Sequence, residues 1–205
     1  PVRWKAWASG IEPKEQPRAG FTEVSIAMPL AKQPEMPGDA PQRYQRPPMF
    51  ELSTFAGWAD VSKTMAPLYA TDGLITPDSP LAGELEKLKA LPGSQREKIA
   101  AALRLVQDHV RYLAVSLNGG NYLPQTPAQT WTLRYGDCKA KTLLLLALLH
   151  GLGIEAEPVL ASSRLGDFVP ERLPSAAALP TESTRTMPRP TREATPPNSN
   201  SPETR

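Results

Sequence analysis

One segment restricts the fold more than any other: residues 143–149 read Leu-Leu-Leu-Leu-Ala-Leu-Leu and contain no polar side chain. A helix that is apolar on every side has no face suited to water, so it must be buried on all sides. Gly136-Asp137 precedes this segment and Gly151 and Gly153 follow it, which marks the two ends of the helix. The sequence therefore predicts a central helix around which the other elements pack.

The single cysteine of the chain, Cys138, stands at the start of this predicted helix. The unpaired N–H groups and the dipole of a helix N-terminus favour negative charge, so they can lower a cysteine pKa well below its ordinary value of about 8.5. The position therefore predicts a reactive thiolate. The alternative is an unreactive buried thiol that packs as a small apolar side chain.

A nucleophilic thiolate also needs a general base, and the sequence offers only His109 and His150. His150 closes the helix that Cys138 opens, so at about 1.5 Å per residue it lies roughly 18 Å away along the axis. We expect it to interact with the C-terminal dipole of that helix. His109 lies at the edge of the apolar stripe of an earlier helix, where we expect a half-buried histidine. It could meet Cys138 only through a tertiary arrangement that the sequence does not reveal.

The residues around Cys138 resemble a known family. The stretch YGDCKAKTLLLLALLHGLGIEAEPVL (135–160) resembles the cysteine-bearing segment of the transglutaminase-like superfamily, especially bacterial members with a GDCKDK motif, although Ala140 replaces the usual Asp. Upstream, VQDHVRY (106–112) is similar to the helix that precedes this segment, and GGNYLP (119–124) with Pro127-Ala128 is similar to the connecting loop. The resemblance covers about residues 95–170. A weaker resemblance covers residues 48–70, which include Trp58. These residues resemble the end of a domain of unknown function that often precedes such cores.

The resemblance implies a papain-like α+β core in which the cysteine attacks an amide carbonyl of a protein or peptide substrate and forms a thioester. In the family, a histidine base and an orienting aspartate follow on two later strands. No histidine follows His150 here, so we expect Cys138 to be the only catalytic residue present and the chain to be inactive. Two alternatives stay open: a non-catalytic peptide-binding module, and a cysteine peptidase in which water rather than an amine resolves the thioester.

Three regions are expected along the chain: a partial β-rich N-terminal domain at 1–72, an incomplete core of helices and a first strand at 79–173, and a disordered tail at 174–205. The tail is rich in Pro, Thr, Ser and Arg and contains no aromatic residue, so it lacks apolar side chains to offset chain entropy. A natural linker explains this composition, but we favour a reading-frame shift near Pro174. Together with the strand-like start at 2–7, it suggests a fragment truncated at both ends.

Several elements are expected within these regions. Frequent prolines at 13–48 favour strands and loops without a helix. Ser94 and Glu97 form a predicted capping box, which opens a helix with an apolar stripe. The stripe consists of Ile99, Leu103, Val106, Val110 and Leu113. The other expected elements are strands at 23–28, 50–54 and 154–161, a helix at 56–69, and a helix from Ser79-Pro80 to near Leu91.

Composition excludes several function classes. The net charge is +2 and basic residues are scattered among acids, so no nucleic-acid surface is predicted. The longest apolar run is far shorter than the roughly 20 residues that span a bilayer, so no membrane segment is predicted either. The sequence contains no metal-ligand spacing, and we expect no cofactor. One cysteine excludes an intrachain disulfide, and the sequence does not indicate a compartment.

The remaining polar residues near Cys138 have structural expectations. We predict that Asp137 is the N-cap of the cysteine helix. Lys139 and Lys141 are expected to be solvated or paired to acids, and Trp131 is expected in the core. Gln125 and Gln129 are candidate oxyanion donors, but their Pro-rich loop favours a surface role. Asp167 is a weak candidate for an orienting acid, because it lies in a Gly-Asp turn.

Overall fold

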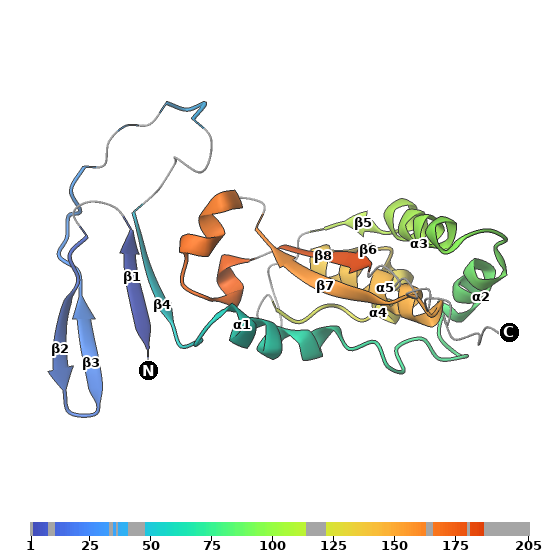
Figure 1. Cartoon of the computed structure of the whole chain (residues 1–205), viewed down its shortest axis with the longest axis horizontal. Coiled ribbons are helices and arrows are strands. Elements are labelled where there is room, and N and C mark those ends of the chain that lie inside the picture. The colour runs from blue at the N-terminus through green and yellow to red at the C-terminus, as the bar shows by residue number, and fades with distance from the viewer. Residues whose placement is uncertain are drawn as a thin grey trace, which may run out of the picture.

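The computed structural model describes residues 2–7, 11–32, 35, 37–40, 48–113, 122–162, 166–179 and 181–186. Within these residues, helices occur together with small two-stranded sheets, so the expected α+β class is confirmed (Figure 1). The predictions that concern residues 119–121 and 187–205 lie outside the described residues. The division into three regions stays a prediction.

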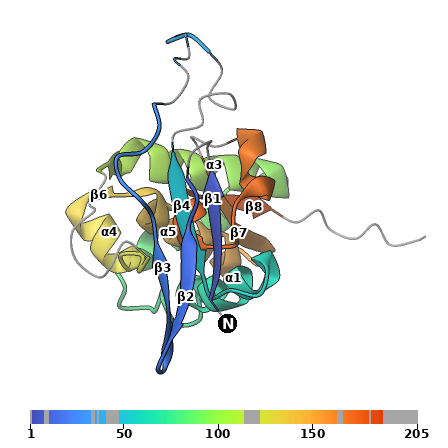
Figure 2. The same cartoon turned by 90° about the vertical axis from the view of Figure 1, so that its left-hand side faces the viewer.

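Helix α5 (Cys138–Gly151) lies at the centre of the packed body, as its sequence predicts (Figure 2). The leucines at 144, 146, 148 and 149 are completely buried. Three further helices surround it: α2 (Ala82–Ala90), α3 (Gln95–His109) and α4 (Pro127–Leu133). Their shared core contains Leu81, Leu85, Leu88, Ala102, Val106, Val110, Trp131, Leu144, Leu148, Leu149 and Ile154.

Helix α3 begins with the predicted capping box, in which Ser94 Oγ accepts the Glu97 N–H and the Glu97 carboxylate accepts the Ser94 N–H. The predicted apolar stripe is wrong at two positions, because Leu103 and Leu113 are exposed. The buried line instead runs through Ala102, Val106 and Val110 at four-residue spacing, which is the face that meets α2 and α5.

The predicted helix at 56–69 forms as α1 (Trp58–Met65) followed by the 3₁₀ turn η1 (Ala66–Tyr69). Pro67 explains the change, because proline has no N–H to continue the α-helical bonding. Val61, Met65 and Tyr69 are buried, in agreement with the expected spacing. Helix α2 begins two residues later than predicted: Ser79-Pro80 forms a turn, in which Ser79 O accepts the Ala82 N–H.

A second strand corrects the expected end of the core. Strand β7 (Ala156–Ala161) pairs in antiparallel register with β8 (Thr181–Thr186), so that Ala156 lies opposite Thr186 and Ala161 opposite Thr181. The connection contains two 3₁₀ helices, η3 (Gly166–Glu171) and η4 (Ala176–Ala178). The prediction of a disordered tail from residue 174 is therefore wrong for the described residues up to 186.

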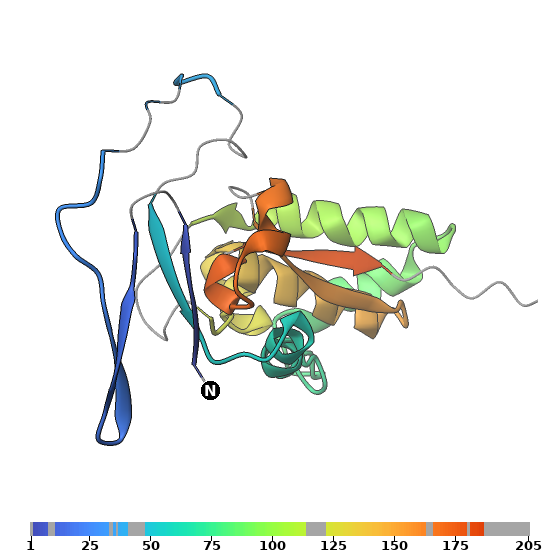
Figure 3. The same cartoon turned by 60° about the vertical axis from the view of Figure 1, so that its left-hand side comes forward.

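In the described residues before α1, the structure has four strands. Strand β1 (Arg3–Trp7) pairs with β4 (Met49–Ser53), and β2 (Lys14–Arg18) forms a hairpin with β3 (Phe21–Ser25). Figures 1 and 3 show the β2–β3 hairpin standing away from the helices. The expected strands at 2–7 and 50–54 are confirmed, and β3 begins earlier than expected. Strand β2 was not predicted, because it contains Pro17.

Candidate active site at the start of helix α5

Cys138 is the first residue of α5, and its side chain is half-buried. Asp137 caps the helix: its backbone is extended, and its Oδ1 accepts the Ala140 N–H at 3.0 Å. The predicted N-cap is therefore confirmed. A capped helix N-terminus that begins at a cysteine is the local geometry that favours an ionised thiol.

A short parallel ladder places a second residue beside the cysteine. Strand β5 (Arg111–Tyr112) pairs with β6 (Tyr135–Gly136), with Tyr112 opposite Gly136. Two backbone bonds hold the ladder: the Arg111 N–H donates to Arg134 O at 2.9 Å, and the Leu113 N–H donates to Gly136 O at 3.1 Å. Because Gly136 lies two residues before Cys138, this register brings Tyr112 to the start of α5.

The Tyr112 hydroxyl forms a hydrogen bond with the Cys138 side chain. Desolvation raises the pKa of Tyr112, and the charge of the Cys138 thiolate and the hydrogen bond to it raise that pKa further. Tyr112 is nevertheless 62% exposed, so we attribute its effect on the sulfur to the hydrogen bond rather than to burial. The sequence placed Tyr112 within a family-like segment without assigning it a role.

Two lysines of the first helical turn are both engaged. Lys139 Nζ lies 2.7 Å from Asp137 Oδ2 in a largely buried ion pair, so its predicted pairing to an acid is confirmed. Lys141 instead donates to the backbone oxygen of Val110 at 2.5 Å, just before β5. Desolvation lowers the pKa of Lys141. The Lys141 bond ties α5 directly to the segment that contains Tyr112.

Close packing behind the cysteine leaves no space for a side chain at Gly136. A Cβ there would lie 2.8 Å from Ala140 Cβ, 3.2 Å from Thr130 Cγ2 and 3.5 Å from Gln125 Oε1. Gln125 is therefore near the site and half-buried. Gln129, in contrast, is exposed and completes the capping box of α4 with Thr126, so it has a structural role.

Neither histidine is placed as a base for Cys138. At the far end of α5, His150 Nδ1 lies 2.6 Å from Thr71 Oγ1 and Nε2 lies 2.9 Å from Ala156 O. His109 lies against the ring of Trp131 with 5.8 Å between centroids, and it is exposed rather than half-buried as predicted. Trp131 is in the core, as expected. Asp167 belongs to η3, and its side chain lies outside the described structure.

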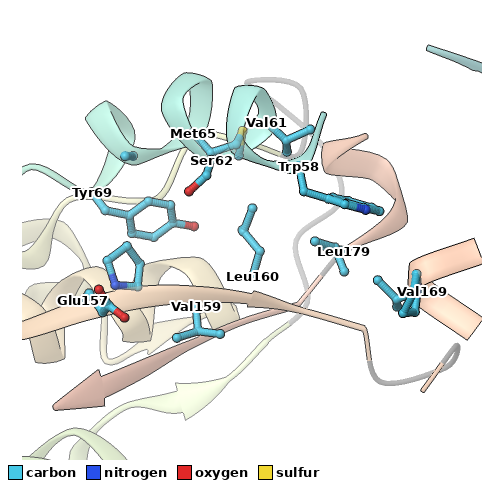
Figure 4. A pocket seen from close by; sticks show the side chains of 13 residues that line it. Trp58, Val61, Ser62, Met65, Tyr69, Glu157, Val159, Leu160, Val169 and Leu179 are labelled. Atoms are coloured by element: carbon cyan, nitrogen blue, oxygen red, sulfur yellow. The ribbon is translucent and has the colours of Figure 1, made fainter. Parts of the chain in front are cut away.

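A groove elsewhere in the molecule is a separate feature. It has a volume of about 660 Å³ and lies between α1 with η1 and β7. Figure 4 shows side chains of α1 and β7 facing each other across it, with Tyr69 toward one end and Trp58 toward the other. Its lining is mainly apolar and includes neither Cys138 nor Tyr112. The groove is therefore not part of the cysteine site.

Two further features are absent from the described part of the chain. It contains no cluster of three or more His, Cys, Asp or Glu side chains that could hold a metal ion. None of its helices combines the length and the apolar character needed to cross a membrane.

Comparison with known structures identifies one informative neighbour. The fold is similar to the crystal structure of a putative protease from Parabacteroides distasonis ATCC 8503, with a TM-score of 0.68 and 15% sequence identity. The match covers 91% of this chain but only 35% of that protein. No family model and no curated protein matches the sequence. The similarity therefore concerns the fold, and this chain spans about a third of its neighbour's length.

Proposed function

We propose that Cys138 is the nucleophile of a cysteine acyl-transfer site of the transglutaminase-like or cysteine peptidase-like kind, acting on amide or peptide substrates. One observation carries the proposal: the cysteine is the first residue of a capped, buried helix, with a tyrosine hydroxyl bonded to it. The fold similarity to a putative protease supports a peptidase-like core. The resemblance of residues 95–170 to the transglutaminase-like superfamily supports the same chemistry.

The absence of a nearby histidine limits what the site does. When a thiolate attacks an amide, the C–N bond breaks only if the leaving amine receives a proton, which a general acid must supply. His150 is engaged at the other end of α5 and His109 lies on Trp131. An activated ester needs no such proton, because its phenolate leaves as an anion. We therefore expect acylation by activated esters without turnover of amides.

Single-turnover acylation tests this proposal. The thiolate of Cys138 attacks the carbonyl of p-nitrophenyl acetate, a C–S bond forms, the C–O bond breaks and p-nitrophenolate is released. We expect a burst of one equivalent of p-nitrophenolate and one acetyl group on Cys138 by peptide mass spectrometry. Cys138→Ala should abolish the burst. A burst that persists in Cys138→Ala, or no burst in the parent chain, contradicts the proposal.

The fate of the acyl group distinguishes transfer from hydrolysis. The acetyl group on Cys138 is exposed to a primary amine such as methylamine. The site favours transfer to amines if methylamine removes this group faster than buffer alone does, and also faster than methylamine removes it from an acetylated small thiol. If the acetyl group on Cys138 is instead hydrolysed by water faster than the acetylated small thiol is, the site favours a peptidase-like hydrolase.

A non-catalytic peptide-binding module is the second candidate, and the positions of the two histidines favour it. In that case Cys138 has the reactivity of an ordinary thiol, and peptide binding is unchanged in Cys138→Ala.

A further inference from the structure

Two independent connections fix Tyr112 relative to Cys138. The β5–β6 ladder holds the backbone of Tyr112 opposite Gly136, with the Leu113 N–H bonded to Gly136 O. The Lys141 ammonium holds Val110, two residues before Tyr112, against the first turn of α5. The segment that contains Tyr112 is therefore held against α5 by both a strand ladder and a side-chain bond to Val110.

We infer that Tyr112 is a positioning residue for Cys138: its hydroxyl donates a hydrogen bond to the thiolate and increases the ionised fraction at neutral pH. This inference rests on the proposed role of Cys138 as the nucleophile. It goes further by naming a residue, outside the family's cysteine, histidine and aspartate, that sets the reactivity of the sulfur.

Other charged groups near the sulfur are less suited to this role. Asp137 is negative, and its charge is offset by Lys139 at 2.7 Å. Lys141, on the same helical turn, donates its hydrogen bond to Val110 O.

The charged groups on the segments beside β5 and β6 also have other contacts. Arg134 stacks on the Trp131 ring at 3.7 Å, and His109 lies against the same ring. Arg111 is exposed and lies opposite Tyr135 in the ladder. The Tyr112 hydroxyl, in contrast, is bonded to the sulfur itself.

The effect is reciprocal. A hydroxyl that donates to a thiolate is itself harder to ionise, in agreement with the raised pKa of Tyr112. The same interaction must stabilise the thiolate by the same free energy, because a coupling between two sites is symmetric. A hydrogen bond to a charged group at a largely exposed position corresponds to a shift of about one pH unit.

The test is the pH dependence of the reaction of Cys138 with 4,4′-dithiodipyridine, a neutral disulfide, in the whole chain and in Tyr112→Phe. The thiolate attacks one sulfur of the probe, a mixed disulfide forms and thiopyridone leaves. We expect the variant's profile to shift upward by about one unit. Thiolate nucleophilicity rises with thiol pKa, with a Brønsted slope of about 0.4–0.5. The variant should therefore react about three- to fourfold more slowly below both midpoints and about threefold faster above them.

Loss of the fold would also raise the midpoint of Cys138 toward that of the unfolded chain and give a similar crossing. The crossing therefore reports on the hydrogen bond only if urea unfolding shows that Tyr112→Phe keeps the cooperative transition of the parent chain. Tyr135→Phe is the matched control: Tyr135 lies on the paired strand and is 37% exposed, and we expect no shift. Superimposable profiles for the parent chain and Tyr112→Phe overturn the inference but leave the nucleophile in place. A parent profile equal to that of the urea-unfolded chain shows instead that the proposed function has failed.

A second measurement covers the case in which Tyr112→Phe does not fold. In the parent background, Cys138→Ala removes the thiolate and should lower the midpoint of one tyrosine in an ultraviolet titration. An unchanged tyrosine titration contradicts the inference.

Discussion

Gly136 determines at the residue scale whether the cysteine site can close. Because Gly136 has no side chain, β6 can approach Ala140 of α5 and Thr130 of α4. The atoms that a Cβ would meet there, Ala140 Cβ and Thr130 Cγ2, do not belong to long, flexible side chains. The same residue accepts the Leu113 N–H and lies opposite Tyr112. Packing behind the cysteine and the position of the tyrosine therefore depend on one glycine.

Replacing Gly136 by alanine should destabilise the fold by about 1–3 kcal/mol, because the added methyl group overlaps Ala140 Cβ at 2.8 Å. Urea unfolding measures the change. Gly83→Ala is the matched control in α2: a Cβ there has no atom within 4 Å, and alanine should stabilise the helix by up to about 1 kcal/mol. Equal effects of the two substitutions would show that Gly136 is not closely packed.

The sequence is sufficient to predict those elements that carry their own local signals. The apolar run of α5 predicts a buried helix, and Ser94 with Glu97 predicts the start of α3. In contrast, β5 and β6 contain two residues each and have no periodic pattern. Their pairing depends on how α3, α4 and α5 pack together. The contact between Tyr112 and Cys138 follows from that packing and could not be predicted from spacing.

Strand β8 shows why composition misled the prediction for the tail. Its sequence, TESTRT, has no apolar alternation, so it offers no side-chain reason to fold. The edge of β7 nevertheless presents unpaired backbone groups, which a second strand satisfies by backbone bonds alone. Threonine also favours extended backbone. A polar segment beside an open strand edge can therefore be ordered.

At the scale of the whole molecule, a buried ion pair joins the N-terminal strands to the segment before β8. Glu51 of β4 bonds with Arg172 and also accepts the Leu173 N–H. The exposed fractions of the two side chains are 8% for Glu51 and 13% for Arg172. Lys5 of β1 donates to Glu171 O. These contacts connect residues more than 120 positions apart, so the β1–β4 sheet and the η3–η4 segment should be stabilised together.

Arg172→Met should lower the free energy of unfolding by about 3 kcal/mol, because it leaves a buried carboxylate without its partner. Hydrogen exchange should show a larger loss of protection in β1 and β4 than in α5. Lys87→Met breaks the exposed Glu84–Lys87 pair and should change stability by less than about 0.5 kcal/mol. A loss for Arg172→Met no larger than for this control would contradict the coupling.

Folding should turn Cys138 into an ionised nucleophile. Because Cys138 is the only cysteine of the chain, the same chain unfolded in urea is the reference for its reactivity. Iodoacetamide alkylation should be followed against pH in buffer and again in unfolding urea, with intact mass as the readout. We predict a midpoint of about 8.5 in urea and one at least about one unit lower in the folded chain. Equal midpoints in the two states would contradict the claim.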